Sequence, residues 1–381
     1  MEAQSLVIEA FPLVNVAELN RGLDALGLGA IVCRAGMNVT YLSGISSPGT
    51  LGRLLDLTDS PREIFVVWPR HGSAVVVLNH IAAPLARATG WIPNLRVYGE
   101  YVESPASAVA SVLEDLKLGK ERIGFDMRWL GAARWNEFTK LLNGATLVDC
   151  TDVLDETRAL KTPAELDKLK LATDVMDMAY KDVFGTIRAG ETERVIHGRI
   201  IRRLLELKTL GPHGILQAST NPVVYGGESD LPVARGDRIR TDYVAYAENY
   251  AANLSRVVSV GPASSDLRGQ YRNYLSAYRE AAELLRPAVT AGEVFTSVGS
   301  VFREHGLPVP TSLVGHGIGA WWHQQEPILA EGNPRLLKPG MVFALEPVSG
   351  FWHLQDEFVI TANGSRLLSD GFDISEMFET G

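Results

Sequence analysis

Hydrophobic and polar residues follow two different periods along the first half of the chain, one typical of helices and one of strands. Residues 16–28 carry apolar side chains at helical spacing and end in glycine, a common helix stop. Short apolar runs bounded by turn residues alternate with further helical patterns, which predicts an α/β domain. The predicted strands are 29–34, 63–69, 73–79, 122–126 and 145–150, and the predicted helices are 16–28, 81–88 and 105–117.

A long helical pattern opens the second half of the chain. Thr162 can cap this helix, Pro163 suits its first position, and Glu165 stands three residues after the cap. Because 381 residues exceed the usual size of one core, we predict two domains, residues 1–158 and 159–381. For the second domain the pattern predicts helices at 191–207, 266–286 and 292–305 and strands at 211–220, 340–348 and 351–361, an α+β arrangement.

The stretch RTDYVAYAENYAANLSR, residues 240–256, has the pattern of two strands joined by a short turn. Asp242 and Asn253 lie eleven residues apart on the two strands. Strand side chains alternate between faces, and a short turn returns the second strand beside the first. We therefore predict that these two polar side chains meet at one site.

Composition and charge narrow the range of partners. The chain carries a net charge of −9, and its Lys and Arg residues are scattered, which argues against a nucleic-acid or anionic-membrane surface and favours a small-molecule substrate. Cys33 and Cys150 are the only cysteines, so neither a disulfide framework nor a thiolate metal site is expected. Without an apolar run of ~18–20 residues or a basic, apolar leader, the chain is predicted to be cytoplasmic and unattached to membranes.

Several motifs in chain order resemble one known family. They are the helix KTPAELDKLK (161–170), the 240–256 hairpin, the block GHGIG (315–319) and the strand around Glu346. Together they resemble the creatinase, prolidase and aminopeptidase P superfamily. The resemblance implies a creatinase-type N-terminal domain, a C-terminal domain of the α+β pita-bread fold, and a homodimer.

In metallopeptidases of this superfamily, five side chains hold two metal ions. Carried onto this sequence, the positions are Asp242, Asn253, His316, Glu346 and Gln355. Two of the five are amides here, and they occupy the places of the bridging carboxylates. The loss of two negative charges argues against a two-metal site, and we expect no metal and no other cofactor. One alternative is a single ion on Asp242, His316 and Glu346, although the family geometry assigns Asp242 to a different metal position from the other two.

A site without metal needs its own acid–base groups. His316 is the best candidate because imidazole titrates near neutrality and the flanking glycines allow a ligand to come close. Glu346 could orient His316 or act as a base itself. Tyr225 stands where creatinase and many prolidases have a histidine, and it could donate a hydrogen bond to a developing oxyanion. We assign these three residues catalytic roles.

The substrate-binding candidates are polar or aromatic. Asp242, Glu346, Glu248 and Asp356 would favour a cationic ligand if no metal neutralises them, and aromatic faces attract cations. In family dimers the first domain caps the partner's site, so Arg53 could pair with a substrate carboxylate. The full set of substrate-binding candidates is Asp242, Asn253, Gln355, His323, Tyr243, Trp321 and Arg53.

These assignments lead to one main prediction and several alternatives. The main prediction is a creatinase-like, metal-independent hydrolase that cleaves a C–N bond in a small polar substrate with a guanidino or amino group. The first alternative is a metal-dependent Xaa-Pro peptidase with a reduced, mononuclear site. The others are a non-catalytic binding relative and a lyase or decarboxylase on the same fold, because a fold does not determine its chemistry.

Overall fold

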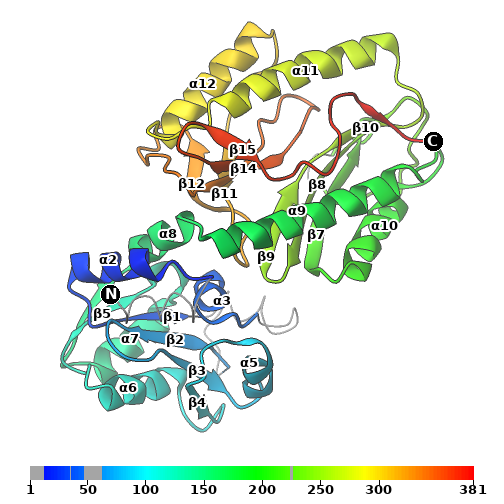
Figure 1. Cartoon of the computed structure of the whole chain (residues 1–381). Helices are drawn as coiled ribbons and strands as arrows, with labels where there is room; N and C mark the ends of the chain where they lie inside the picture. Colours follow the sequence, from blue (N-terminus) through cyan, green and yellow to red (C-terminus); the bar gives the residue numbers. More distant parts are fainter. Residues whose placement is uncertain (1–12, 35, 47–61, 224–225) are drawn as a thin grey trace. The chain divides into compact units, whose positions relative to one another are not determined.

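The computed structural model describes residues 13–34, 36–46, 62–223 and 226–381 (Figure 1). They form two compact units, which change over between Thr162 and Pro163, and residues 320–322 group with the first unit. The domain limits 1–158 and 159–381 remain a prediction. None of the helices in the described ranges is long and apolar enough to cross a membrane.

The first unit is built on a six-stranded mixed sheet in the order β4-β3-β2-β1-β5-β6. Its central strand β1 pairs antiparallel with β2 and parallel with β5. The strands are β1 (Ala30–Arg34), β2 (Phe65–Pro69), β3 (Val75–Asn79), β4 (Leu95–Tyr98), β5 (Arg122–Phe125) and β6 (Thr146–Asp149). The helices are α2 (Val16–Leu26), α3 (Met37–Ser43), α5 (Ala83–Thr89), α6 (Pro105–Asp115), α7 (Ala132–Leu141) and α8 (Thr151–Ala159), with a 3-10 turn at Met127–Trp129.

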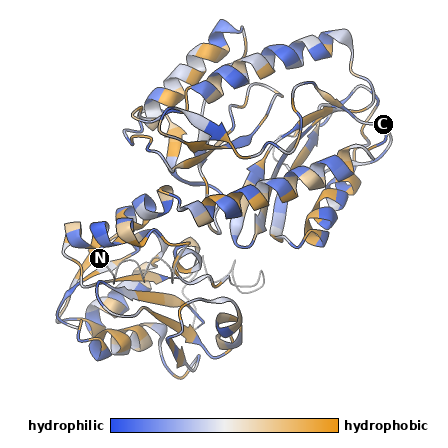
Figure 2. Ribbon diagram, viewed as in Figure 1, coloured by the Kyte–Doolittle hydropathy of each residue, from blue (hydrophilic) through white to orange (hydrophobic). Residues whose placement is uncertain are grey.

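The predicted helices and strands of this unit are confirmed, and its described residues also form elements that the residue pattern did not predict. These are α3, β4, α7, α8 and the 3-10 turn. Apolar side chains of the central strands and α6 form the core, and Figure 2 shows these strands as largely hydrophobic while the helices carry both hydrophobic and hydrophilic residues. The one-sided hydropathy of the helices reflects their packing on a sheet.

The second unit contains two five-stranded sheets. One has the order β16-β10-β8-β7 with β9 paired to β8, and the other has the order β12-β11-β13-β14-β15. The strands are β7 (Leu210–Ala218), β8 (Arg238–Ala247), β9 (Tyr250–Leu254), β10 (Val257–Ser259), β11 (Leu313–Gly317), β12 (Gln325–Ala330), β13 (Val342–Leu345), β14 (Asp356–Ile360), β15 (Ser365–Leu367) and β16 (Phe378–Glu379). The helices are α9 (Pro163–Phe184), α10 (Glu193–Glu206), α11 (Ser265–Glu283) and α12 (Ala291–Glu304).

The predicted hairpin is confirmed as β8 and β9. Glu248 and Asn249 form its two-residue turn, with φ angles of 48° and 73°. Left-handed conformations at both positions match the twist of the flanking strands, and asparagine tolerates them better than most residues. Tyr243 pairs with Leu254 and Val244 with Asn253, so Asp242 and Asn253 are diagonal neighbours on one face.

A buried cation joins three segments of this unit. Arg256 is 1% exposed at its side chain, and its Nη2 contacts Asp177 of α9 at 3.0 Å and Asp356 of β14 at 2.9 Å. Its Nη1 donates to the carbonyl oxygens of Ser255 and Gln355. These contacts fix the start of β14 against β9, which positions residue 355 beside the hairpin.

Candidate active site

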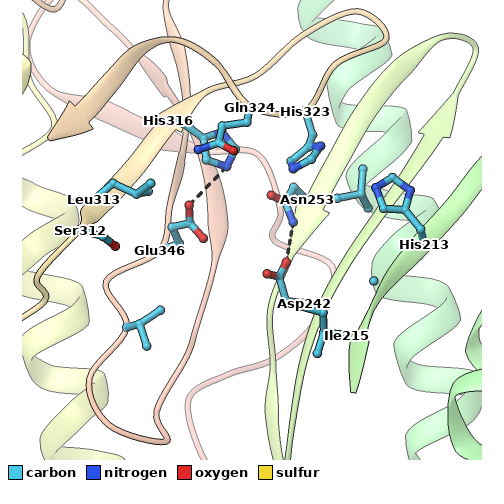
Figure 3. Close-up of a pocket in the computed structure, with 13 residues that line it drawn as sticks. His213, Ile215, Asp242, Asn253, Ser312, Leu313, His316, His323, Gln324 and Glu346 are labelled. Carbon is cyan, nitrogen blue, oxygen red and sulfur yellow. Dashed lines mark hydrogen bonds and ion pairs between the residues drawn. The ribbon is translucent and has the colours of Figure 1, made fainter. Parts of the chain in front are cut away.

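A cavity of about 470 Å³ lies in the second unit, and the two sheets supply most of its walls (Figure 3). The strand β7 contributes one side, β8 and β9 contribute Asp242 and Asn253, and β11 contributes His316. The lining residues are His213, Gly214, Ile215, Asp242, Val244, Asn253, Ser312, Leu313, His316, His323, Gln324, Glu346 and Val348. Polar groups therefore gather at one place in a partly apolar cavity, as in many small-molecule sites.

Asp242, Asn253 and Gln355 form a chain of hydrogen bonds. Asn253 Nδ2 donates to Asp242 Oδ1 at 2.9 Å, and Gln355 Nε2 donates to Asn253 Oδ1 at 2.9 Å (Figure 3 shows the first of these). The hydroxyl of Ser255 donates to Gln355 Oε1 at 2.9 Å. A carboxylate only accepts hydrogen bonds, so Asp242 requires the NH2 group of Asn253 to point toward it. The oxygen of Asn253 then accepts from Gln355, which fixes the orientation of the second amide. The predicted meeting of Asp242 and Asn253 is confirmed.

The glycines beside His316 serve the neighbouring strands. A Cβ at Gly315 would lie 2.5 Å from the Ala344 carbonyl oxygen, and one at Gly317 would lie 2.6 Å from the Glu326 carbonyl oxygen. Side chains at these positions would push apart the strands that flank β11. We expected these glycines to let a ligand come close, and this expectation is corrected. They allow the backbone of the neighbouring strands to approach β11 instead.

His316 and Glu346 face one another across the cavity wall (Figure 3). Nδ1 of His316 lies 2.9 Å from the carbonyl oxygen of Gly317, which can only accept, so Nδ1 carries the proton. In the neutral ring Nε2 is then an acceptor, and it lies 3.4 Å from Glu346 Oε1. Nε2 of His353 lies 3.5 Å from the other oxygen of the same carboxylate. Glu346 thus stands between two imidazoles.

Sequence reasoning missed several residues at this site, among them His213 of the cavity lining and also His353, whose Nε2 faces Glu346. His353 lies two positions before Gln355, and residues two apart in an extended segment face the same side, so the alternation of 351–361 contained the signal. The side chains of Asp242, Glu346 and His353 each present one ligand atom, and these atoms lie within 4.8 Å of one another.

His323 lines the same cavity beside two other histidines. Its ring centroid lies 5.8 Å from that of His316 and 5.9 Å from that of His213. Burial, reinforced by the neighbouring imidazoles, lowers the pKa of His323 to about 3. His323 is therefore neutral at physiological pH and can act as a hydrogen-bonding group.

Other predicted residues lie elsewhere. Tyr243 is fully buried in the core of the second unit, on the opposite face of β8 from Asp242, and its hydroxyl contacts His197 Nδ1 at 2.7 Å. Its predicted contact with substrate is corrected, because strand side chains alternate between faces. Gln355 is fully buried and acts through Asn253. Trp321 groups with the first unit.

The structure also bears on two acidic residues that were predicted to attract a cationic ligand, Asp356 and Glu248. Asp356 is buried against Arg256, and Glu248 pairs with Lys168 at the hairpin turn, so neither contributes a free charge to the cavity. Tyr225 and Arg53 lie outside the described residues. Their catalytic and binding roles remain predictions.

The residues present do not match a two-metal site but do suit one ion. Asn253 and Gln355 use their amide groups in the hydrogen-bonded chain, so neither offers a carboxylate bridge between two ions. Asp242, Glu346 and His353 are close enough to converge on one cation. Carboxylate and imidazole donors of this kind bind first-row divalent metals.

Comparison with known proteins identifies the family. A model of metallopeptidase family M24 matches residues 167–377, more than half of the chain, and a model of the creatinase/prolidase N-terminal domain matches residues 16–160. The chain belongs to metallopeptidase family M24. The predicted fold class, a creatinase-type N-terminal domain followed by an α+β pita-bread domain, is confirmed.

Individual proteins and one solved structure are also similar to this chain. The chain is 31% identical to a probable dipeptidase PepE of Mycobacterium bovis over 238 residues, which cover 58% of this chain and 61% of that protein. It is 26% identical to an Xaa-Pro dipeptidase of Lactobacillus delbrueckii subsp. lactis over 349 residues, covering 87% of this chain and 92% of that one. An X-Pro aminopeptidase from Thermotoga maritima shares the fold with a TM-score of 0.77, 20% identity and coverage of 94% and 99%.

These findings overturn the main functional prediction. A metal-independent, creatinase-like hydrolase for a cationic small molecule is wrong, because the M24 relatives are named dipeptidases and Xaa-Pro dipeptidases and their family is one of metallopeptidases. That prediction gave the loss of two bridging carboxylates more weight than the single-ion alternative on Asp242, His316 and Glu346. His353 was not considered as a replacement donor.

Proposed function

We propose that the protein is a metal-dependent peptidase that hydrolyses dipeptides, with Xaa-Pro dipeptides as the preferred class. The observation that carries this proposal is that ligand atoms of Asp242, Glu346 and His353 lie within 4.8 Å of one another. Asp242 and Glu346 also line the cavity. The alignment with an Xaa-Pro dipeptidase over 87% of the chain supports the substrate class. A homodimer and a cytoplasmic location remain predictions.

The cavity suits a small peptide with one apolar ring. Its volume of about 470 Å³ lies within the range of small-ligand pockets. Ile215, Val244, Leu313 and Val348 supply apolar wall against which a proline ring could pack. The polar groups are gathered around Asp242 and Glu346, so the peptide amino group and the scissile amide would be directed to that end.

The residues divide the chemical work among them. Asp242, Glu346 and His353 would hold the metal. A metal bound there would supply a nucleophilic hydroxide and polarise the peptide carbonyl. Nε2 of His316, an acceptor in the neutral ring, can hold a proton passing between the attacking water and the leaving amine. His323, neutral and at the cavity wall, can donate a hydrogen bond to the peptide carbonyl.

The test is hydrolysis of defined dipeptides by the purified protein. We expect cleavage of Ala-Pro and Leu-Pro, slower cleavage of Ala-Ala, loss of activity with a strong chelator, and recovery with Mn²⁺, Co²⁺ or Zn²⁺. Glu346→Gln should lower kcat/KM by about 100-fold or more, since it removes a charged ligand, whereas the exposed control Glu304→Gln should leave it unchanged.

Two outcomes would contradict the proposal. Cleavage that survives complete removal of metal would exclude a metal-dependent mechanism. Absence of dipeptide hydrolysis with every metal tested would instead favour the non-catalytic or lyase alternatives.

A further inference from the structure

We propose that His353 is a metal ligand in this protein and that, with Asp242 and Glu346, it forms a one-ion site shifted from the two-ion arrangement of the family. His353 is none of the five positions that the resemblance assigned to metal. The catalytic meaning of this ion rests on the proposed function, but its existence can be tested without any substrate.

The first observation is the environment of His353. The residue is 1% exposed, and its buried Nε2 makes no hydrogen bond with any residue that the structure describes. A buried polar atom without a hydrogen bond is costly, so such atoms in native proteins usually have a partner, an ordered water or an ion. Nε2 lies 3.5 Å from Glu346 Oε2 and belongs to the group of ligand atoms within 4.8 Å of one another.

The second observation is the spacing around Glu346. Its two oxygens lie 3.4 Å and 3.5 Å from the Nε2 atoms of His316 and His353, beyond the usual length of a charge-assisted hydrogen bond. A cation on the His353 side of Glu346 would meet Nε2 of His353, a carboxylate oxygen of Glu346 and a carboxylate oxygen of Asp242, which already lie within 4.8 Å of one another.

The third observation is the way Asp242 is held. Asn253 donates to Oδ1 of Asp242, which orients the carboxylate and engages one oxygen. Gln355 and Ser255 support Asn253 in turn. Outer groups of this kind fix the orientation of metal ligands in known sites. The amides of Asn253 and Gln355 are thus positioning residues: they orient Asp242 and do not bind the ion themselves.

The donor set indicates the class of ion. One imidazole and two carboxylates suit Zn²⁺, Co²⁺ or Mn²⁺ better than Ca²⁺ or Mg²⁺, which prefer oxygen alone. Asp242 and Glu346 both line the cavity, so a further coordination position can face it. Three protein ligands and one open position are typical of catalytic zinc sites.

The experiment measures metal binding directly. Full-length protein, stripped of metal by chelation and dialysis, is titrated with Zn²⁺ and Co²⁺ by calorimetry. We expect one equivalent for the wild type, binding weakened by about 100-fold in His353→Gln, and a smaller loss of about ten-fold in the matched variant His316→Gln, whose side chain contacts the ligand Glu346 without belonging to the proposed ligand set. Circular dichroism verifies that each variant is folded.

A second variant reports coordination by a spectroscopic signal. His353→Cys keeps a ligand atom at this position, so it should retain Co²⁺ and display a thiolate-to-cobalt charge-transfer band. The wild type should lack that band, since Cys33 and Cys150 are buried in the first unit. This variant also decides the question if His353→Gln does not fold.

The possible results separate this inference from the proposed function. Undiminished binding in His353→Gln together with loss in His316→Gln would overturn the inference, and so would two equivalents, no binding, or a folded His353→Cys protein without the band. Metal-dependent dipeptide cleavage could still be observed in the first two cases. One equivalent held through His353, with no dipeptide cleaved, would support the inference and reject the function.

Discussion

At Asn253 a primary amide stands between the carboxylate of Asp242 and the amide of Gln355, and each contact has a donor on one side and an acceptor on the other. A carboxylate at residue 253 would reverse this pattern, because it would place an acceptor against Asp242. The amide is therefore compatible with the protein before any metal binds, whereas an aspartate would depend on a cation. This difference predicts how each residue responds to substitution.

Asn253→Asp should make stability depend on metal. In the presence of chelator we expect a loss of about 3 kcal/mol, because a buried carboxylate at residue 253 would face the partly exposed carboxylate of Asp242 without a proton or cation between them. Adding Zn²⁺ should restore most of it. Thermal unfolding with and without metal measures the effect, and the exposed substitution Asn143→Asp is the control.

The double variant Asn253→Asp/Gln355→Glu should recover the five-ligand set of the family. We expect its metal content to rise from one equivalent to two, as measured by elemental analysis after equilibrium dialysis against Mn²⁺ or Co²⁺. A content that stays at one equivalent would show that the backbone no longer places these ligands for two ions.

Asp126 supplies a pH-dependent contribution in the first unit. Burial raises the pKa of this carboxyl to about 6, although hydrogen bonding from Asn38 and the charge of Arg158 oppose the shift. In the unfolded chain it ionises near 3.8, so its contribution to stability is complete below that pH and is lost as pH rises to about 6. The loss amounts to about 3 kcal/mol.

Asp126→Asn should therefore remove this pH dependence. Relative to the wild type, we expect the variant to gain about 2–3 kcal/mol between about pH 4 and pH 7. Urea denaturation of both proteins at the two pH values measures it. Equal changes in both proteins would mean that Asp126 ionises normally in the folded state.

Among the elements, the segment that leads from β13 to β14 decides the geometry of the site. It carries His353 and Gln355, and Arg256 anchors its end through Asp356 and the carbonyl oxygen of Gln355. Asp177 of the long helix α9 contacts the same guanidinium. Three segments distant in sequence thus contact one buried charge. This contact fixes the position of the segment that carries His353 and Gln355.

Arg256→Leu should destabilise the second unit by about 3–5 kcal/mol, since it leaves two buried aspartates without their cation. Chemical denaturation provides the measurement. The exposed pair of Arg202 and Glu206 on α10 offers a control, and Arg202→Ala should cost no more than about 0.5 kcal/mol.

At the scale of the whole molecule, all proposed ligands belong to one of the two compact units. A metal that binds only the folded second unit stabilises that unit by mass action, by about 2.7 kcal/mol at a free concentration of about 100 times Kd. For a unit of this size the expected rise in Tm is about 5–10 °C. Calorimetry should show that the transition of the second unit moves while that of the first does not.

Sequence patterns by themselves determined the order of most helices and strands, the α/β and α+β character of the two halves of the chain, and the meeting of Asp242 with Asn253. These features follow from side-chain periodicity and from a turn of two residues, which act locally. The resemblance to a known family, rather than these patterns, implied the creatinase-type and pita-bread domains and singled out His316 and Glu346, which line the cavity, and Gln355, which contacts Asn253. The same comparison with the family showed amides, Asn253 and Gln355, at the positions of two carboxylates.

Only the tertiary structure decided which side chains converge. His353 lies more than 100 residues from Asp242 along the chain, and its approach depends on the pairing of separate strands and on the buried charge of Arg256. The same packing placed Asp356 against Arg256 instead of in the cavity. Contacts between distant segments depend on the whole fold, which is why residue type and spacing alone could not predict them.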